Sequence, residues 1–185
     1  MNRFCENIMF WVERNAKPNR IIIGIIWIVF VNAVIFPYFP NRIDADFPLQ
    51  KILDTRVGFM PAEAKQLFTV LGEKGREAYF LTSVLVDNLY ALTYGFIYAF
   101  LLVFLLKKVY PYNYNSKRHW IGLPFMVAGF DLLENVGIQT ALLMYPKSND
   151  WLLLVTVFFN VMKWFSGFVL LISVLSLFVK WIFKK

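Results

Sequence analysis

Residues 120–145, WIGLPFMVAGFDLLENVGIQTALLMY, form an apolar run that is long enough for one helix to cross a bilayer. The run nevertheless carries Asp131, Glu134 and Asn135 near its centre. A charged side chain that faces lipid at the middle of a membrane costs at least about 2.5 kcal/mol on insertion scales. The stretch therefore predicts a spanning helix whose polar face is turned toward other helices.

Three further apolar runs, at 20–38, 79–106 and 151–183, also reach the length of a membrane-spanning helix. Hydrophobic residues make up 59% of the 185-residue chain, which is high for a soluble protein. The runs lack the alternation of barrel strands, and only helices or closed barrels satisfy their backbone in lipid. The sequence predicts an all-α integral membrane protein, a four-transmembrane-helix bundle that forms one membrane domain over 1–185.

The net charge of +7 is distributed in a way that predicts orientation. Lysine and arginine residues cluster before the first run, between the second and third, and after the fourth, which an even number of crossings places on one side. By the positive-inside rule that side is cytoplasmic, so we expect a multi-pass protein of the cell membrane with both termini inside. The 39–78 stretch has six basic and six acidic residues, as a translocated loop would. No basic stripe stands on a soluble face, so nucleic acid is not an expected partner.

The segments that flank the first run predict two short surface helices. Residues 1–19 place apolar side chains at helical spacing among charges, which is typical of an interfacial helix. At the end of the first run, Pro37, Pro40 and Pro48 predict that residues 36–48 cannot form one helix. Residues 61–71 then predict a short extracytoplasmic helix over the bundle mouth.

Cysteine and histidine usage limits the chemistry. Cys5 is the single cysteine, which excludes an intramolecular disulfide and a Cys-x-x-Cys redox motif. His119 is the single histidine and lies at the predicted cytoplasmic edge of the third span. Zinc sites and His-assisted nucleophilic catalysis therefore lack their usual residues, and we expect neither a metal nor a cofactor.

Polar residues in the spans share helix faces, because each residue of a helix turns by about 100°. A rise of about 1.5 Å per residue places them about 9–21 Å below the outer helix ends, so they should face one another inside the bundle. The predicted catalytic residues are Asp87, Asp131, Glu134 and Lys163, and the predicted ligand-binding residues are Asn32, Asn88, Tyr90, Tyr94, Asn135 and Asn160.

The charges of this predicted site do not balance. Asp87, Asp131 and Glu134 face one amine, Lys163, which we expect to pair with Asp131 or Glu134. Full ionisation would leave two negative charges uncompensated where little water is present. Protonation, a bound cation, a cationic ligand or entering water must neutralise them.

Three functions fit these features. The leading one is the binding or processing of a membrane lipid or another amphiphile, in which one carboxyl serves as general acid, its neighbour as base, and Lys163 or a tyrosine stabilises negative charge. The second is a proton- or cation-handling transporter or channel subunit, for which a homodimer would supply the repeat that four helices lack. The third is a non-catalytic membrane partner, in which the polar residues hold helices together at about 0.6–2 kcal/mol each.

Overall fold

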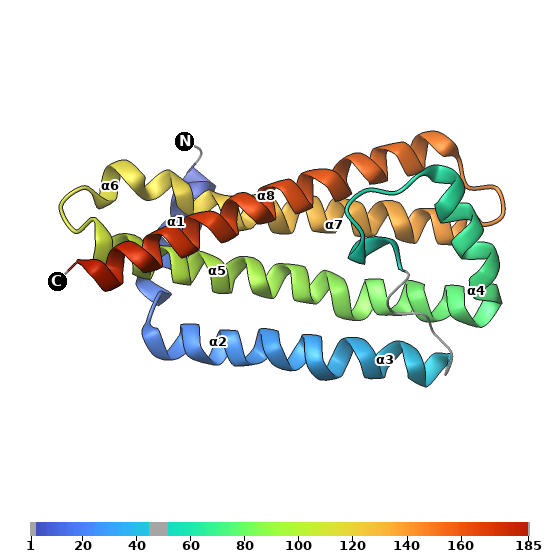
Figure 1. The fold of residues 1–185 in the computed structure, drawn as a ribbon, viewed down its shortest axis with the longest axis horizontal. Helices are drawn as coiled ribbons and strands as arrows, with labels where there is room; N and C mark the ends of the chain where they lie inside the picture. The colour runs from blue at the N-terminus through green and yellow to red at the C-terminus, as the bar shows by residue number, and fades with distance from the viewer. Residues whose placement is uncertain (1–2, 45–51, 185) are drawn as a thin grey trace.

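The computed structural model describes residues 3–44 and 52–184, and within these ranges the chain is helix and connecting loop without a strand (Figure 1). The elements are α1 (Arg3–Asn15), α2 (Pro18–Phe30), η1 (Val31–Ile35), α3 (Phe36–Ile43), η3 (Leu53–Thr55), α4 (Pro61–Thr82), η4 (Ser83–Asp87), α5 (Asn88–Val109), α6 (Tyr114–Lys117), η5 (Arg118–Ile121), α7 (Gly122–Leu143) and α8 (Asp150–Phe183). Here η1 and η4 are π-helical, and η3 and η5 are 3₁₀-helical.

Four helical stretches in the described residues are long and apolar enough to cross a membrane, which confirms the predicted number and suggests a multi-pass membrane protein. They are Pro18–Ile43, Pro61–Val109, Tyr114–Leu143 and Asp150–Phe183. Three of them contain an apolar run in full, the third ends at Leu143, two residues before the end of the 120–145 run, and the second begins well before residue 79.

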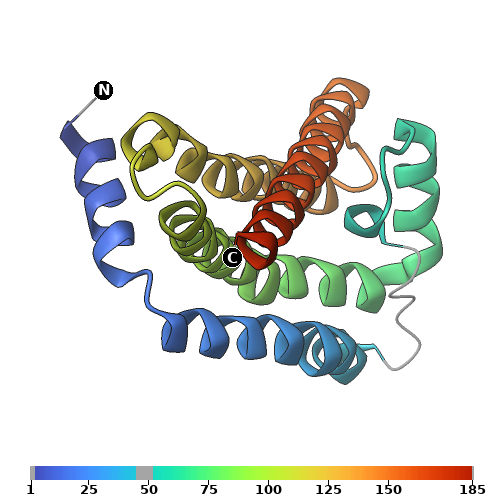
Figure 2. The ribbon, with the colours of Figure 1, turned by 60° about the vertical axis from the view of Figure 1, so that its left-hand side comes forward.

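The long helices run side by side, with α7 packed against both α5 and α8, and with α2 on α5 (Figures 1 and 2). The N-terminus, the α6 turn and the C-terminal end of α8 lie at one end of the bundle (Figure 1). Helix α4 and the segment before it lie at the opposite end (Figure 1). The three basic clusters of the sequence therefore lie at the same end.

Helix α7 approaches α8 so closely at Gly137 that no larger residue fits. A Cβ atom added there would lie 2.1 Å from Thr156 Oγ1 and 2.9 Å from Thr156 Cβ. On the α5 side, a Cβ at Gly95 would lie 3.0 Å from the Cβ of Ala128. Small residues let helices approach this closely in a membrane bundle.

The first spanning helix continues past the residue where the sequence predicted its end. Helix α3 reaches Ile43 with Pro37 in its first turn and Pro40 inside it, so the expectation that these two prolines break the helix is wrong. Asp44 is extended, so no single helix covers residues 36–48, as predicted. In η1 the Phe36 nitrogen donates to the Val31 carbonyl five residues back, which resets the hydrogen-bond register before Pro37. Pro37 has no N–H to donate, and it follows directly on the wide turn that has already changed the hydrogen-bond register. Pro48 lies outside the described residues.

Helix α4 contains the predicted 61–71 helix and continues beyond it. Gly72 has a φ of +64°, a left-handed conformation that glycine adopts without strain, and the chain kinks there before it runs through η4 into α5. Leu67, Phe68 and Leu71 are buried and pack in a cluster with Tyr79 and Ile138. This part of α4 is thus fixed on the end of the bundle.

Helix α1 is docked on the opposite end through Glu13. The Glu13 carboxylate lies 2.5 Å from the guanidinium of Arg118 and accepts a hydrogen bond from the Tyr114 hydroxyl at 2.8 Å. Val12 is fully buried beside Glu13. These contacts hold the amphipathic N-terminal helix against the α6–η5 turn.

Candidate functional site

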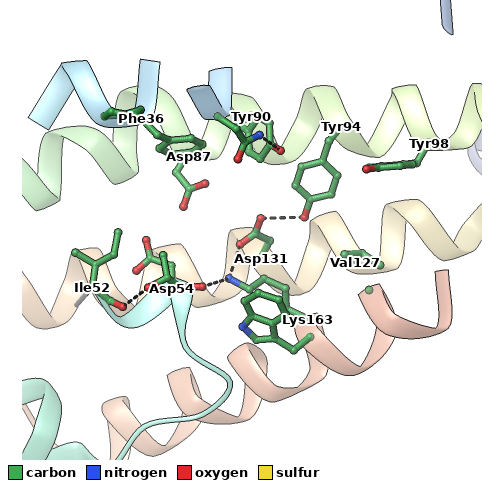
Figure 3. Close-up of a pocket in the computed structure, with 15 residues that line it drawn as sticks. Phe36, Ile52, Asp54, Asp87, Tyr90, Tyr94, Tyr98, Val127, Asp131 and Lys163 are labelled. Carbon is green, nitrogen blue, oxygen red and sulfur yellow. Dashed lines mark hydrogen bonds and ion pairs between the residues drawn. The ribbon is translucent and has the colours of Figure 1, made fainter. Parts of the chain in front are cut away.

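A cavity of about 570 Å³ lies among the long helices, where the sequence placed its polar constellation (Figure 3). The residues that line it come from η1, α3, η4, α5, α7, α8 and the segment that contains η3, and they are Asn32, Phe36, Pro37, Ile52, Asp54, Thr55, Asp87, Tyr90, Tyr94, Tyr98, Val127, Asp131, Lys163, Trp164 and Gly167. Its wall therefore combines three carboxyls, one lysine and several aromatic rings.

Lys163 forms the centre of an ion-pair network at the edge of the cavity. Its ammonium lies 2.5 Å from Glu134 Oε2 and 3.1 Å from Asp131 Oδ1, so the expected pairing involves both acids. It also donates to the backbone carbonyl of Asp54 at 3.3 Å. Two ion pairs and one hydrogen bond thus already occupy this ammonium.

The segment between the first and second spans enters the bundle and supplies Asp54, which the sequence analysis did not assign to the site. Asn160 on α8 holds the segment, since its amide donates to the Arg56 carbonyl at 3.1 Å and its Oδ1 accepts from the Gly58 nitrogen at 2.6 Å. The Tyr79 hydroxyl accepts from the Leu53 nitrogen at 3.1 Å and donates to the Asp54 carboxylate. The site therefore has four carboxyls, one more than predicted.

Burial is the largest influence on the Asp54 carboxyl and raises its pKa above the ordinary value of 3.8. The Lys163 ammonium and the hydrogen bond from Tyr79 act in the opposite direction, and the nearby Asp131 charge adds to the rise. Asp54 thus has an increased tendency to hold a proton where it meets the cavity.

Asp87 is a buried carboxyl whose negative charge no nearby lysine or arginine neutralises in an ion pair within the described residues. Only 8% of its surface is exposed, and it lines the cavity opposite Asp54 (Figure 3). Among residues 3–44 and 52–184 it forms no ion pair. Its hydrogen-bond partner is the Asn135 amide, which also donates to Asn88 Oδ1 at 3.2 Å.

Aromatic rings cover the α5 side of the cavity. Tyr90 and Tyr94 meet edge to face with centroids 5.3 Å apart, and Phe36 packs on Tyr90 at the same distance (Figure 3). The Tyr94 hydroxyl donates to Asp131 Oδ2 at 2.9 Å, and Asn32 donates to the Tyr90 hydroxyl at 2.7 Å. The polar tips are thus oriented by partners while the ring faces border the open space.

A second cavity of about 380 Å³ continues the first between α5, α7 and α8. Five lining residues are common to both cavities, namely Tyr94, Tyr98, Val127, Trp164 and Gly167. The remaining lining of the second cavity is Phe168, Leu170, Leu171 and Val174, all apolar. The combined space therefore has a polar, acidic end and an apolar end.

The predicted site residues fall into two groups. Six of them line the cavity, namely Asn32, Asp87, Tyr90, Tyr94, Asp131 and Lys163. The other four, Asn88, Glu134, Asn135 and Asn160, lie behind its wall. Glu134 is fully buried and accepts from the Asn160 amide at 2.7 Å, so it reaches the cavity only through Lys163.

The carboxyls are not arranged as a metal centre. In the part of the chain that the structure describes, no group of three or more His, Cys, Asp or Glu side chains could hold a metal ion. Comparisons of the chain with family models, curated proteins and solved structures found no match.

Proposed function

We propose that this chain is an integral membrane protein that binds an amphiphile inside its helix bundle. The polar cavity takes the headgroup, and the apolar cavity that continues it takes part of the hydrocarbon chain. The observation that carries the proposal is the shared wall of the two cavities, because a space that is acidic at one end and apolar at the other matches a lipid-like molecule.

The alternatives receive less support. A transporter or channel needs a polar path toward both faces, whereas the space continues from the acidic residues into an apolar cavity. Polar side chains that serve only to join helices would be expected to fill the space between them, since interiors pack densely. A void of about 570 Å³ beside Asp87 does not fit that function.

The site also offers acid–base chemistry to a bound lipid. Asp54, Asp87 and Asp131 line the cavity and can reach a headgroup, and the Lys163 ammonium can stabilise negative charge that develops next to Asp131. Glu134 would then be a positioning residue that holds Lys163. The protein could thus also process the amphiphile that it binds.

The orientation belongs to the same proposal. The three basic clusters lie at the end that carries both termini. By the positive-inside rule, we propose that this end faces the cytoplasm and that the protein lies in the cell membrane. The Asp54 segment then lies toward the outside, and the cavity lies in the outer part of the bilayer.

Gly167 provides the test of amphiphile binding. It lines both cavities, and a Cβ added there would make only an ordinary contact of 3.9 Å with Val127. Gly167→Leu should fill the junction, whereas Gly167→Ala should leave most of it open. Native mass spectrometry of the purified proteins should find an amphiphile retained by the wild type and Gly167→Ala and absent from Gly167→Leu. Equal retention by all three, or none by the wild type, contradicts the proposal.

A further inference from the structure

We propose that the amphiphile bound by this cavity carries a cationic amine headgroup. This inference rests on the proposed function and specifies the chemical class of its ligand. Some charges of the site already have partners of opposite sign, and others do not.

The single ammonium that lines the cavity is already engaged. Lys163 pairs with Glu134 at 2.5 Å and Asp131 at 3.1 Å and donates to the Asp54 carbonyl at 3.3 Å, so its charge already has two partners. An anionic headgroup would have to break one of these contacts and would approach several carboxyls. Like charges at such distances repel strongly where little water is present.

Asp87 supplies a negative charge that could pair with a cationic headgroup. It is more than nine-tenths buried, lines the cavity, and forms no ion pair in the described residues. The Asp54 carboxyl faces it across the cavity, with a hydrogen bond from Tyr79 but also without an ion pair in those residues (Figure 3). A protonated amine between the two carboxyls could donate hydrogen bonds to both and would reduce the negative excess of the site by one charge.

The aromatic lining suits the same headgroup. Phe36, Tyr90 and Tyr94 form a row of edge-to-face rings on one side of the cavity. Trp164 lines another side, and its ring centroid already lies 5.8 Å from the Lys163 ammonium. Aromatic faces attract cations within about 6 Å, and this attraction increases when the site excludes water. Carboxylates and rings together thus favour an amine over a phosphate or a sugar.

The experiment compares three probes that share one alkyl chain and differ in headgroup charge. Octylamine, octyl phosphate and octyl glucoside are titrated into the protein in uncharged maltoside micelles at neutral pH. Binding is followed by tryptophan fluorescence, and the change should disappear in Trp164→Phe, because Trp164 lines both cavities. We expect octylamine to bind at least about ten-fold more tightly than the other two probes.

Two charge-removing variants complete the test. Asp87→Asn should weaken octylamine binding on the order of ten- to a hundred-fold and leave octyl glucoside unchanged. Glu73→Gln, an exposed position on α4 at the same end of the bundle, is the matched control and should bind all three probes as the wild type does. The thermal midpoint of Asp87→Asn in the same micelles shows that it is folded.

The outcomes distinguish failure of the cationic headgroup from failure of amphiphile binding itself. Equal affinity for the three probes, or an octylamine preference that Asp87→Asn leaves intact, overturns the cationic headgroup and leaves amphiphile binding standing. Binding of none of the probes by the folded wild type counts against both.

Discussion

Asn160 on α8 accepts a hydrogen bond from the backbone nitrogen of Gly58 at 2.6 Å, although 102 residues separate them in the chain. The same amide donates to the Arg56 carbonyl and to Glu134 Oε1. One buried side chain thus connects the segment that carries Asp54 to the helix that carries Lys163. The position of Asp54 at the cavity depends on this connection.

Asn160→Ala should therefore release this segment from the bundle. The substitution leaves the Gly58 nitrogen and the Arg56 carbonyl without this partner, which costs about 1–3 kcal/mol for each buried group left unsatisfied. We expect a lower thermal midpoint and faster amide hydrogen exchange over residues 52–60. Asn115→Ala, at an exposed position, should change neither quantity. Unchanged exchange in Asn160→Ala would show that other contacts hold the segment.

The sequence predicts the helices and six of the residues that line the cavity, because both depend on local patterns. Apolar runs define the spans, and helical spacing places Asp87, Tyr90 and Tyr94 on one face. Asp54 could not be found in this way, since it lies outside every apolar run and reaches the site through contacts such as that of Gly58 with Asn160. The available signal was Asn160, a polar residue on α8 whose amide can make several hydrogen bonds, of which Glu134 in the other spans takes one.

The π-helical segments are the second feature that periodicity misses. Asn32 lies in η1 and Asp87 in η4, so each segment supplies a polar residue to the cavity. A π-turn shifts the helix register by one residue and changes which side chains face inward. Sequence reasoning that assumes a regular α-helix places both residues on the right face but does not predict the wide turns, or the continuation of the first helix past Pro37.

Asp54 should make stability depend on pH in a defined direction. Because burial raises its pKa above 3.8 in the folded protein, folding favours the protonated form. The resulting stabilisation is complete below 3.8 and is lost as the pH rises through the raised value. The thermal midpoint of the wild type relative to Asp54→Asn should therefore fall as the pH increases from 3.8. Parallel pH profiles for the two proteins would exclude a raised pKa for Asp54.

The proposed orientation can be tested by cysteine labelling in intact cells on a Cys5→Ser background. Ser116 and Lys147 are both exposed and lie in the turns at opposite ends of the bundle, whereas Ser148 is buried and unsuitable as a reporter. An impermeant maleimide added outside should label Lys147→Cys and leave Ser116→Cys unlabelled until the cells are opened. Labelling of Ser116→Cys alone would show that the orientation is opposite to the proposed one.

Gly137 and Gly129 give a matched pair of substitutions on α7. Gly137→Ala would place a Cβ 2.1 Å from Thr156 Oγ1, and rotation of that side chain would not relieve the contact because Thr156 Cβ itself lies at 2.9 Å. Overpacking of this kind costs about 1–3 kcal/mol, so the thermal midpoint should fall. Gly129→Ala meets nothing within 4 Å and should leave stability equal or higher. Equal effects would indicate that α7 and α8 are not in close contact at Gly137.

The ion-pair network around Lys163 should behave as a unit. Lys163→Met removes the partner of two buried carboxylates and should destabilise the protein by about 3–5 kcal/mol, because the charge of Glu134 is left fully buried. Adding Glu134→Gln to this variant should recover part of the loss, since the uncompensated charge is then removed. Lys65→Met is the control, because Lys65 pairs with Asp150 on the exposed surface at 2.6 Å, where an ion pair contributes about 0–1 kcal/mol.

Asp87→Asn should have the opposite effect from Lys163→Met, since Asp87 has no ion pair to lose within the described residues and adds to the negative excess. We expect a thermal midpoint in detergent that is equal to or above that of the wild type, together with loss of ligand binding. The combination matters, because a residue used only for packing loses stability when it is replaced, whereas a residue kept for a ligand loses binding and relieves repulsion. Thermal midpoints that fall by similar amounts in Asp87→Asn and Lys163→Met, with additive double mutants, would show that these residues are independent structural contacts.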